Sequence, residues 1–284
     1  MIYYVLLICL PFVSICQSIA QKQYTLKEKQ PNVILFSAIT AFIALCFFIL
    51  TSGFDLTFDA RLIPYSLVFA AGYCASWIGT VYAVRYGSMA LTSLITSFSL
   101  ILPTGYGILL GEEVTVKLIL GVLLLLSAIV LVNLKLNRKD KLSMKWIMFV
   151  ALSFAGNGTC SIVQNLEKRA MGEAFTHEFM IIGLAAAFVF LIAFACFKGG
   201  KTVVKELKVC LPYGAGNGLS NAMVHFLMMT LIGNIPNTIM YPTSSALGMM
   251  VAFLLAFVVY KERFTKPQYA GYVLGVISLI LLNI

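Results

Sequence analysis

Glu262-Arg-Phe-Thr265, near one end of the 284-residue chain, repeats the pattern Glu112-Glu-Val-Thr115 at a spacing of 150 positions. A glycine comes six residues after each threonine, at Gly121 and Gly271. Apolar runs of about 20 residues, long enough to cross a bilayer as helices, lie on both sides of each motif. Each copy therefore predicts a helical hairpin with a Glu-x-x-Thr turn, and the repeat predicts a chain built from two related halves.

The composition favours a membrane protein over a soluble one. Hydrophobic residues make up 61% of the chain and charged residues 11%, with a mean hydropathy of +0.96. Soluble domains carry about 25% charged residues, so a chain this apolar cannot bury its side chains in one globular core. Because backbone polar groups must be satisfied internally in lipid, and the runs show no alternation, we expect an all-α integral membrane protein.

The predicted fold has ten transmembrane helices arranged as two inverted five-helix repeats. The first repeat covers residues 1–134, a basic linker covers 135–145, and the second repeat covers 146–284. Fainter matches support the duplication, such as Ser18-Ile-Ala-Gln21 with Ser161-Ile-Val-Gln164. The predicted spans are 2–20, 33–52, 62–84, 88–110, 115–134, 145–165, 177–197, 209–231, 237–260 and 266–284.

The positions of the basic residues predict the topology. If the N-terminus is outside, the cytoplasmic connections hold 16 of the 20 Lys and Arg residues. Short loops rich in these residues stay in the cytoplasm, so both termini are expected outside. The N-terminus has no basic region or cleavage site typical of a signal peptide and is expected to be the first span. Topology also explains the net charge of +9, so we expect no nucleic-acid partner.

The chain resembles the EamA-type transporters of the drug/metabolite transporter (DMT) superfamily. The resemblance is carried by Gly111-Glu-Glu-Val-Thr115 with Gly121 and by the second copy, Glu262-Arg-Phe-Thr265 with Gly271. The resemblance implies alternating access by two inverted halves and a central substrate cavity, lined mainly by helices 1, 3, 4, 6, 8 and 9. Two features depart from it. Well-known relatives keep both termini in the cytoplasm, and Pro103 and Pro242 do not align at the 150-residue spacing.

The expected substrate site lies near the middle of the membrane. Asn217, Asn221 and His225 form a polar stripe on one face of the predicted helix 209–231, because residues four apart share a face. Ionisable groups inside a span are functional hypotheses by default. Asn157 and Gln164 of the helix 145–165 are further substrate-binding candidates. The equally weighted alternative is that they only hydrogen-bond to the stripe and hold the two helices together.

Aromatic and hydroxyl side chains complete the set of substrate-binding candidates. Tyr73 and Trp77 lie on one face of the helix 62–84 and either wall a cavity or pack. Tyr241 and Ser244 flank Pro242, which frees a backbone carbonyl of the kind that transporters use for substrate.

The turn motif itself is interpreted as structural. Glutamates and threonines at helix ends usually accept backbone N–H bonds, and glycines allow close packing. The opposite placement of the two copies also puts the turns far from a midplane cavity. The predicted structural residues are Glu112, Thr115, Gly121, Glu262, Thr265 and Gly271.

Several kinds of chemistry are disfavoured. All eleven acidic residues fall in predicted loops or helix ends, and the first helix carries Gln17 and Gln21 in place of the buried glutamate of small multidrug exporters. The seven cysteines show no C-x-x-C pairing, so we expect no metal site and no catalytic residue. A Gly-rich phosphate loop is absent from the sequence, so ATP is not expected to drive the protein directly.

The sequence therefore predicts a secondary transporter that exports a small organic metabolite through the plasma membrane. It is not expected to be an enzyme or to need a cofactor. Expected partners are the lipid bilayer, a small-molecule substrate and a coupling ion, with the chain as a monomer or homodimer. The alternatives are an uptake permease of the same fold, an integral membrane enzyme acting on a lipid carrier, and a membrane partner protein that transports nothing.

Overall fold

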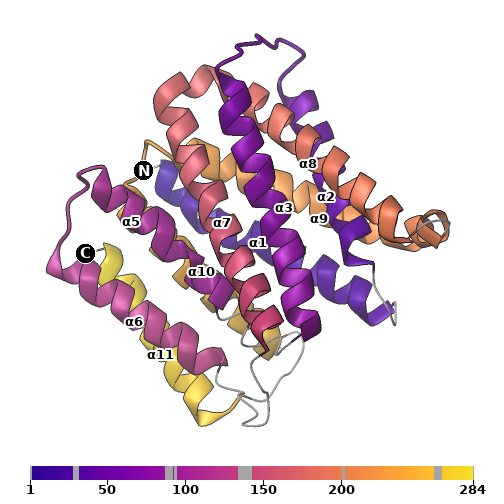
Figure 1. Cartoon of the computed structure of the whole chain (residues 1–284). Coiled ribbons are helices and arrows are strands. Elements are labelled where there is room, and N and C mark those ends of the chain that lie inside the picture. Colours follow the sequence, from indigo (N-terminus) through magenta and orange to yellow (C-terminus); the bar gives the residue numbers. More distant parts are fainter. Residues whose placement is uncertain are drawn as a thin grey trace.

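The computed structural model describes residues 2–27, 32–86, 92, 95–133, 143–199, 202–258 and 264–283. Helices joined by short connections make up this part of the chain (Figure 1). In the first half they are α1 (Ile2–Lys27), α2 (Val33–Thr51), α3 (Leu62–Tyr86), η1 (Phe98–Leu100), α5 (Ile101–Leu109) and α6 (Val116–Asn133). In the second half they are α7 (Met144–Met171), η2 (Glu173–Phe175), α8 (Thr176–Gly199), α9 (Thr202–Leu231), α10 (Asn237–Val258) and α11 (Lys266–Asn283).

The all-helical prediction is confirmed, and helices occupy the predicted apolar segments wherever the structure describes them. Three helices extend at least six residues further than expected: α1 continues to Lys27, beyond residue 20, α7 continues to Met171, beyond residue 165, and α9 begins at Thr202, before residue 209. The ends of α7 are set by local chemistry. The Ser143 hydroxyl accepts the Trp146 N–H, and Gly172, with φ 81°, ends the helix. The start of the segment 88–110 and most of the linker 135–145 lie outside the described residues.

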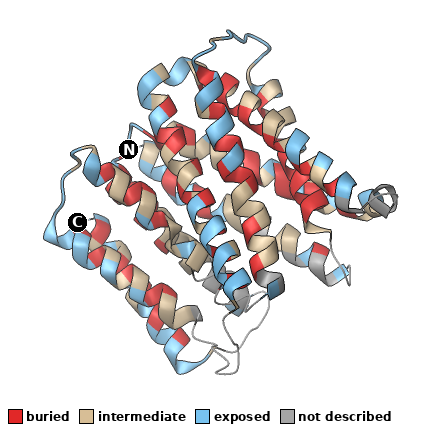
Figure 2. Ribbon diagram, viewed as in Figure 1, coloured by how far each residue is buried: buried red, intermediate tan, exposed pale blue. Residues whose placement is uncertain are grey.

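The described helices have the properties of a membrane protein. Five candidate spans are long and apolar enough to cross a bilayer: Ile2–Gln21, Val33–Thr51, Leu62–Ala83, Met144–Met171 and Glu173–Phe197. Large apolar side chains such as Leu123, Phe190 and Val273 are exposed on the outer faces of the bundle. Figure 2 shows the buried residues gathered along the inward faces of the helices. A bilayer would cover the exposed apolar surface.

Close contacts join the first half of the chain to the second. α3 packs along α7, α1 along α9, and α2 against both α8 and α9. Glycines permit this approach, because a Cβ atom at Gly79 would lie 2.6 Å from the backbone nitrogen of Ser153. A Cβ atom at Gly218 on α9 would lie 2.8 Å from the carbonyl of Thr40 on α2. Small residues at helix interfaces are typical of membrane bundles, and here they interlock the two halves.

The glycines of the repeated motif perform the same task in both copies. A Cβ atom at Gly121 on α6 would lie 2.9 Å from Leu282 Cγ on α11. A Cβ atom at Gly271 on α11 would lie 2.8 Å from Val132 Cγ2 on α6. The start of each helix thus meets the end of the other, so α6 and α11 run antiparallel and side by side (Figure 1). The two contacts use residues at the same spacing of 150.

Thr115 of the motif caps a helix, whereas Glu112 has a more distant partner than predicted. Thr115 Oγ1 accepts the Leu118 N–H at 3.1 Å, at the start of α6. The sequence analysis expected Glu112 to cap its own turn, but its Oε2 accepts the Thr238 N–H of α10 at 2.8 Å. The connection between α5 and α6 is thereby fixed to the second half of the chain. Glu262 lies outside the described residues.

Thr265, the second threonine of the motif, makes one of the two bonds of a capping box at the start of α11. The Gln268 side chain accepts the Thr265 backbone N–H at 2.9 Å, and its amide donates to the Val132 carbonyl of α6 at 3.2 Å. The helix start and the α6–α11 contact therefore share one side chain.

Candidate functional site

Four of the predicted substrate-site residues come together where α3, α7 and α9 meet. The Tyr73 hydroxyl of α3 donates to Asn221 Oδ1 of α9 at 3.2 Å. One turn along α9, His225 Nδ1 is 3.2 Å from Gln164 Nε2 of α7. Tyr73 and Gln164 are buried, at 4% and 2% exposed. The first pair joins the two halves of the chain and the second lies within the second half. We name Tyr73, Asn221, His225 and Gln164 the central cluster.

Aromatic rings surround His225 on the side of α3. The ring centroids of Phe69 and Tyr73 lie 5.5 and 6.2 Å from that of His225. Trp77 continues the row, with its centroid 6.3 Å from that of Tyr73. Phe69 is fully buried and was missed by the sequence analysis, although its position four residues before Tyr73 places it on the same helical face.

Asn157 and Asn217 lie outside the central cluster. Ser76 Oγ of α3 donates to Asn157 Oδ1 of α7 at 2.8 Å. One turn away, the Thr80 and Ser153 hydroxyls are 2.6 Å apart and continue this contact between the two helices. Asn217 turns toward α2, where its Nδ2 donates to Thr40 Oγ1 at 2.9 Å. The three residues of the predicted stripe on α9 therefore bond three different helices, α2, α3 and α7.

Tyr241 belongs to a second polar cluster, between α7 and α10. Its hydroxyl accepts Asn165 Nδ2 at 2.9 Å and donates to the Ser161 carbonyl at 3.3 Å. Asn165 is 1% exposed and was missed by the sequence analysis. Its neighbour Gln164 faces α9, so consecutive residues of α7 serve the two clusters. Ser244 is half-buried and makes no side-chain hydrogen bond within the described part of the chain.

The cavity beside the central cluster is small. It has a volume of about 160 Å³ and is lined by Trp77 and Thr80 of α3 together with Gln21, Tyr24, Val33, Phe36 and Val81. Small-molecule sites usually occupy roughly 300–1,000 Å³. This cavity is smaller than that range, and none of the four central-cluster residues lines it.

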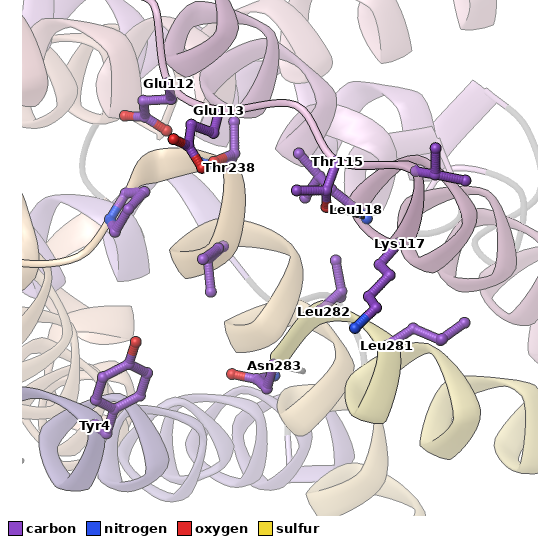
Figure 3. A pocket seen from close by; sticks show the side chains of 13 residues that line it. Tyr4, Glu112, Glu113, Thr115, Lys117, Leu118, Thr238, Leu281, Leu282 and Asn283 are labelled. Atoms are coloured by element: carbon purple, nitrogen blue, oxygen red, sulfur yellow. Dashed lines mark hydrogen bonds between the residues drawn. The ribbon is translucent and has the colours of Figure 1, made fainter.

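A larger cavity, of about 670 Å³, lies toward the end of the bundle where both termini are found (Figures 1 and 3). Its walls come from the α5–α6 connection, α1, α10 and α11. Figure 3 shows Glu112, Glu113 and Thr238 on one side of the space, with Tyr4 and Asn283 opposite. The sequence analysis placed the turn motif far from a midplane cavity, and Glu112 and Thr115 line this cavity at the end of the bundle.

Neither a disulfide nor a metal site is found among the described residues. The cysteines are free, and Cys74, Cys160 and Cys210 are buried as small apolar side chains. No group of three His, Cys, Asp or Glu side chains in the described ranges is arranged to hold a metal ion.

Comparison with known proteins bears on the fold alone. No protein-family model and no curated protein matches the chain. Among the 28 matching chains of solved structure, one crystal structure of a protein has a TM-score of 0.73 and covers 97% of this chain and 95% of its own. The two sequences are 14% identical. The helical arrangement therefore extends over nearly the whole of both chains.

Proposed function

We propose that the protein is a secondary transporter of a small organic metabolite, with the central cluster as its substrate site. The observation that carries this proposal is the position of the cluster. Tyr73 of the first half bonds Asn221 of the second. His225, which pairs with Gln164 within the second half, packs its ring against Phe69 and Tyr73 of the first. A rocking motion of one half against the other changes the distance between such groups, as alternating access requires.

The arrangement of helices supports ten spans in two inverted repeats. The pairing of α3 with α7 has a counterpart in that of α1 with α9, which is expected if α1, α2 and α3 correspond to α7, α8 and α9. The antiparallel contact of α6 with α11 is also expected for copies that enter the membrane from opposite sides. The resemblance to EamA-type transporters rests on the same motif and points to export from the cell across the plasma membrane.

Flux in proteoliposomes tests the proposal directly. A panel of radiolabelled amino acids, nucleobases, amines and sugars is offered to purified protein, and uptake against empty liposomes identifies a substrate. We expect His225→Ala and Asn221→Ala to reduce that flux at least about tenfold, because Asn221 bonds Tyr73 of the other half and the His225 ring packs against Phe69 and Tyr73 there.

Ser220→Ala is the matched control, since Ser220 lies on α9 and bonds only to the Gly216 carbonyl of its own helix. Equal flux in His225→Ala and the control would make the cluster a packing feature. A modified lipid appearing without flux would instead favour the membrane-enzyme alternative.

A further inference from the structure

Two glutamates at the junction of α7, η2 and α8 are buried, although the sequence places both near helix ends. Glu167 is 0% exposed, and neither of its carboxylate oxygens has a hydrogen-bond partner. Glu178 is 7% exposed, and its Oε2 also lacks a partner. Eight buried side-chain polar atoms lack a partner within the described residues, and five of them belong to residues 167–178.

The nearest cation is already engaged elsewhere. Lys168 lies next to Glu167 in sequence, but its ammonium donates to the Met229 carbonyl of α9 at 2.9 Å and pairs with Glu173 at 3.0 Å. Glu167 lies within reach of the attractive charge of Lys168 and the repulsive charge of Glu178. It is therefore a buried acid without a donor that would stabilise its anion.

A carboxylate in such surroundings favours the neutral form, because removing an unpaired charge from water is expensive whereas a protonated carboxyl is not charged. We propose that Glu167 is a proton-binding site, and that loss of its proton displaces Glu178. The proton leaves a Glu167 oxygen for bulk water and the carboxylate anion stays behind. Two like charges then share a buried space and repel each other.

The displacement of Glu178 has a defined structural consequence. Glu178 Oε1 accepts the Thr57 N–H at 2.9 Å and the Thr57 hydroxyl at 3.4 Å. Thr57 lies in the connection between α2 and α3, and α3 carries Tyr73 of the central cluster. Protonation of Glu167 thus holds this connection in place, and deprotonation releases it. The idea that this release is the coupling step of a transport cycle rests on the proposed function. Proton binding at Glu167 and the displacement of Glu178 do not depend on it.

The surrounding elements carry other charged and titratable groups. They are Lys168 and Arg169 on α7, Glu173 on η2, His177 and Glu178 on α8, His225 on α9, Tyr106 on α5, Tyr241 on α10, and the Asp59–Arg61 ion pair before α3. Divalent metal ions such as Ca²⁺ take about 6–8 oxygen ligands, and two carboxyl groups fall short of that number. A proton needs only one oxygen.

Infrared difference spectroscopy on the purified full chain, with no substrate present, tests proton binding. We expect a protonated-carboxyl band at neutral pH that disappears as the pH is raised. Glu167→Gln should lack this band, and Glu113→Gln, which changes an exposed glutamate, should keep it. A wild-type protein without the band at neutral pH would overturn the proposal. A band that is removed by added sodium or calcium ions at constant pH would also overturn it, in favour of a cation site.

Hydrogen–deuterium exchange of the peptide containing Thr57 tests the displacement. After correction for intrinsic pH dependence, exchange in the wild type should rise about tenfold as the infrared band disappears, because a hydrogen bond to a charged group is lost. Glu178→Gln should keep the band but lose this rise, which keeps the test valid if Glu167→Gln fails to fold. Unchanged exchange in the wild type would refute the displacement. A wild type with both signals but no flux would refute the proposed function alone.

Discussion

Gly156→Ala tests whether the contact between α3 and α7 has no space for a single added methyl group. The new Cβ atom would lie 2.5 Å from the Ser76 nitrogen and 2.6 Å from the Gly72 carbonyl. Both are backbone atoms of a helix and cannot rotate away. Reaching ordinary contact, which begins at 3.4 Å, requires the helices to separate locally by about 0.9 Å.

The separation gives an estimate of the loss in stability. Overpacking of this kind costs about 1–3 kcal/mol. The hydrogen bond from Ser76 to Asn157, now 2.8 Å, would stretch beyond 3.5 Å and add about 1 kcal/mol. The total of about 2–4 kcal/mol corresponds to a fall in melting temperature of about 10 °C for a chain of this size.

Intrinsic fluorescence provides the assay, because the two tryptophans, Trp77 and Trp146, lie on the two helices concerned. Gly105→Ala on α5 is the matched control, since no atom lies within 4 Å of its added Cβ. We expect the control to melt at or slightly above the wild-type temperature, as alanine favours a helix. If Gly156→Ala melts with the control, the described α3–α7 contact is wrong.

Two further predictions concern the connection between α5 and α6 and the orientation of the chain in the membrane. Glu112→Ala removes the acceptor of the Thr238 N–H at the start of α10 and should lower stability by about 1 kcal/mol, measured by thermal melting. Glu113→Ala, at the neighbouring exposed position, should change nothing, and equal losses in the two variants would contradict the assigned bond. For topology, a C-terminal fusion partner that is active only in the cytoplasm should be silent if the charge distribution sets the orientation. An active fusion would place the C-terminus inside.

The sequence predicted the helices well because long apolar runs in this chain have one stable outcome. Helix ends were less accurate, because an apolar run marks the part that lipid can cover, whereas the helix continues wherever its backbone bonds can. The extension of α7 to Met171 is the instructive case. Because α7 continues past residue 165, Glu167 lies inside the helix and is buried, whereas the sequence analysis placed it at a helix end.

The candidate site was predicted in part. Asn221 and His225 lie one turn apart and both contact α3, so their shared face was sufficient to group them. Asn217 shares that face but lies about 12 Å along the axis from His225, far enough to meet another helix. The spacing of polar residues shows which of them share a face of a helix, but not which other helices pack against that face. Asn165 was missed for the same reason, because its partner Tyr241 lies on a different helix, α10.

Gln164 and Asn165 occupy consecutive positions of α7, and each bonds a different helix. Consecutive side chains of a helix point about 100° apart, so turning α7 about its axis to tighten one bond swings the other side chain off its partner. The two polar clusters are therefore coupled through rotation of α7 about its axis. A perturbation confined to Tyr241 on α10 should be detectable at His225 on α9, with α7 as the moving part between them.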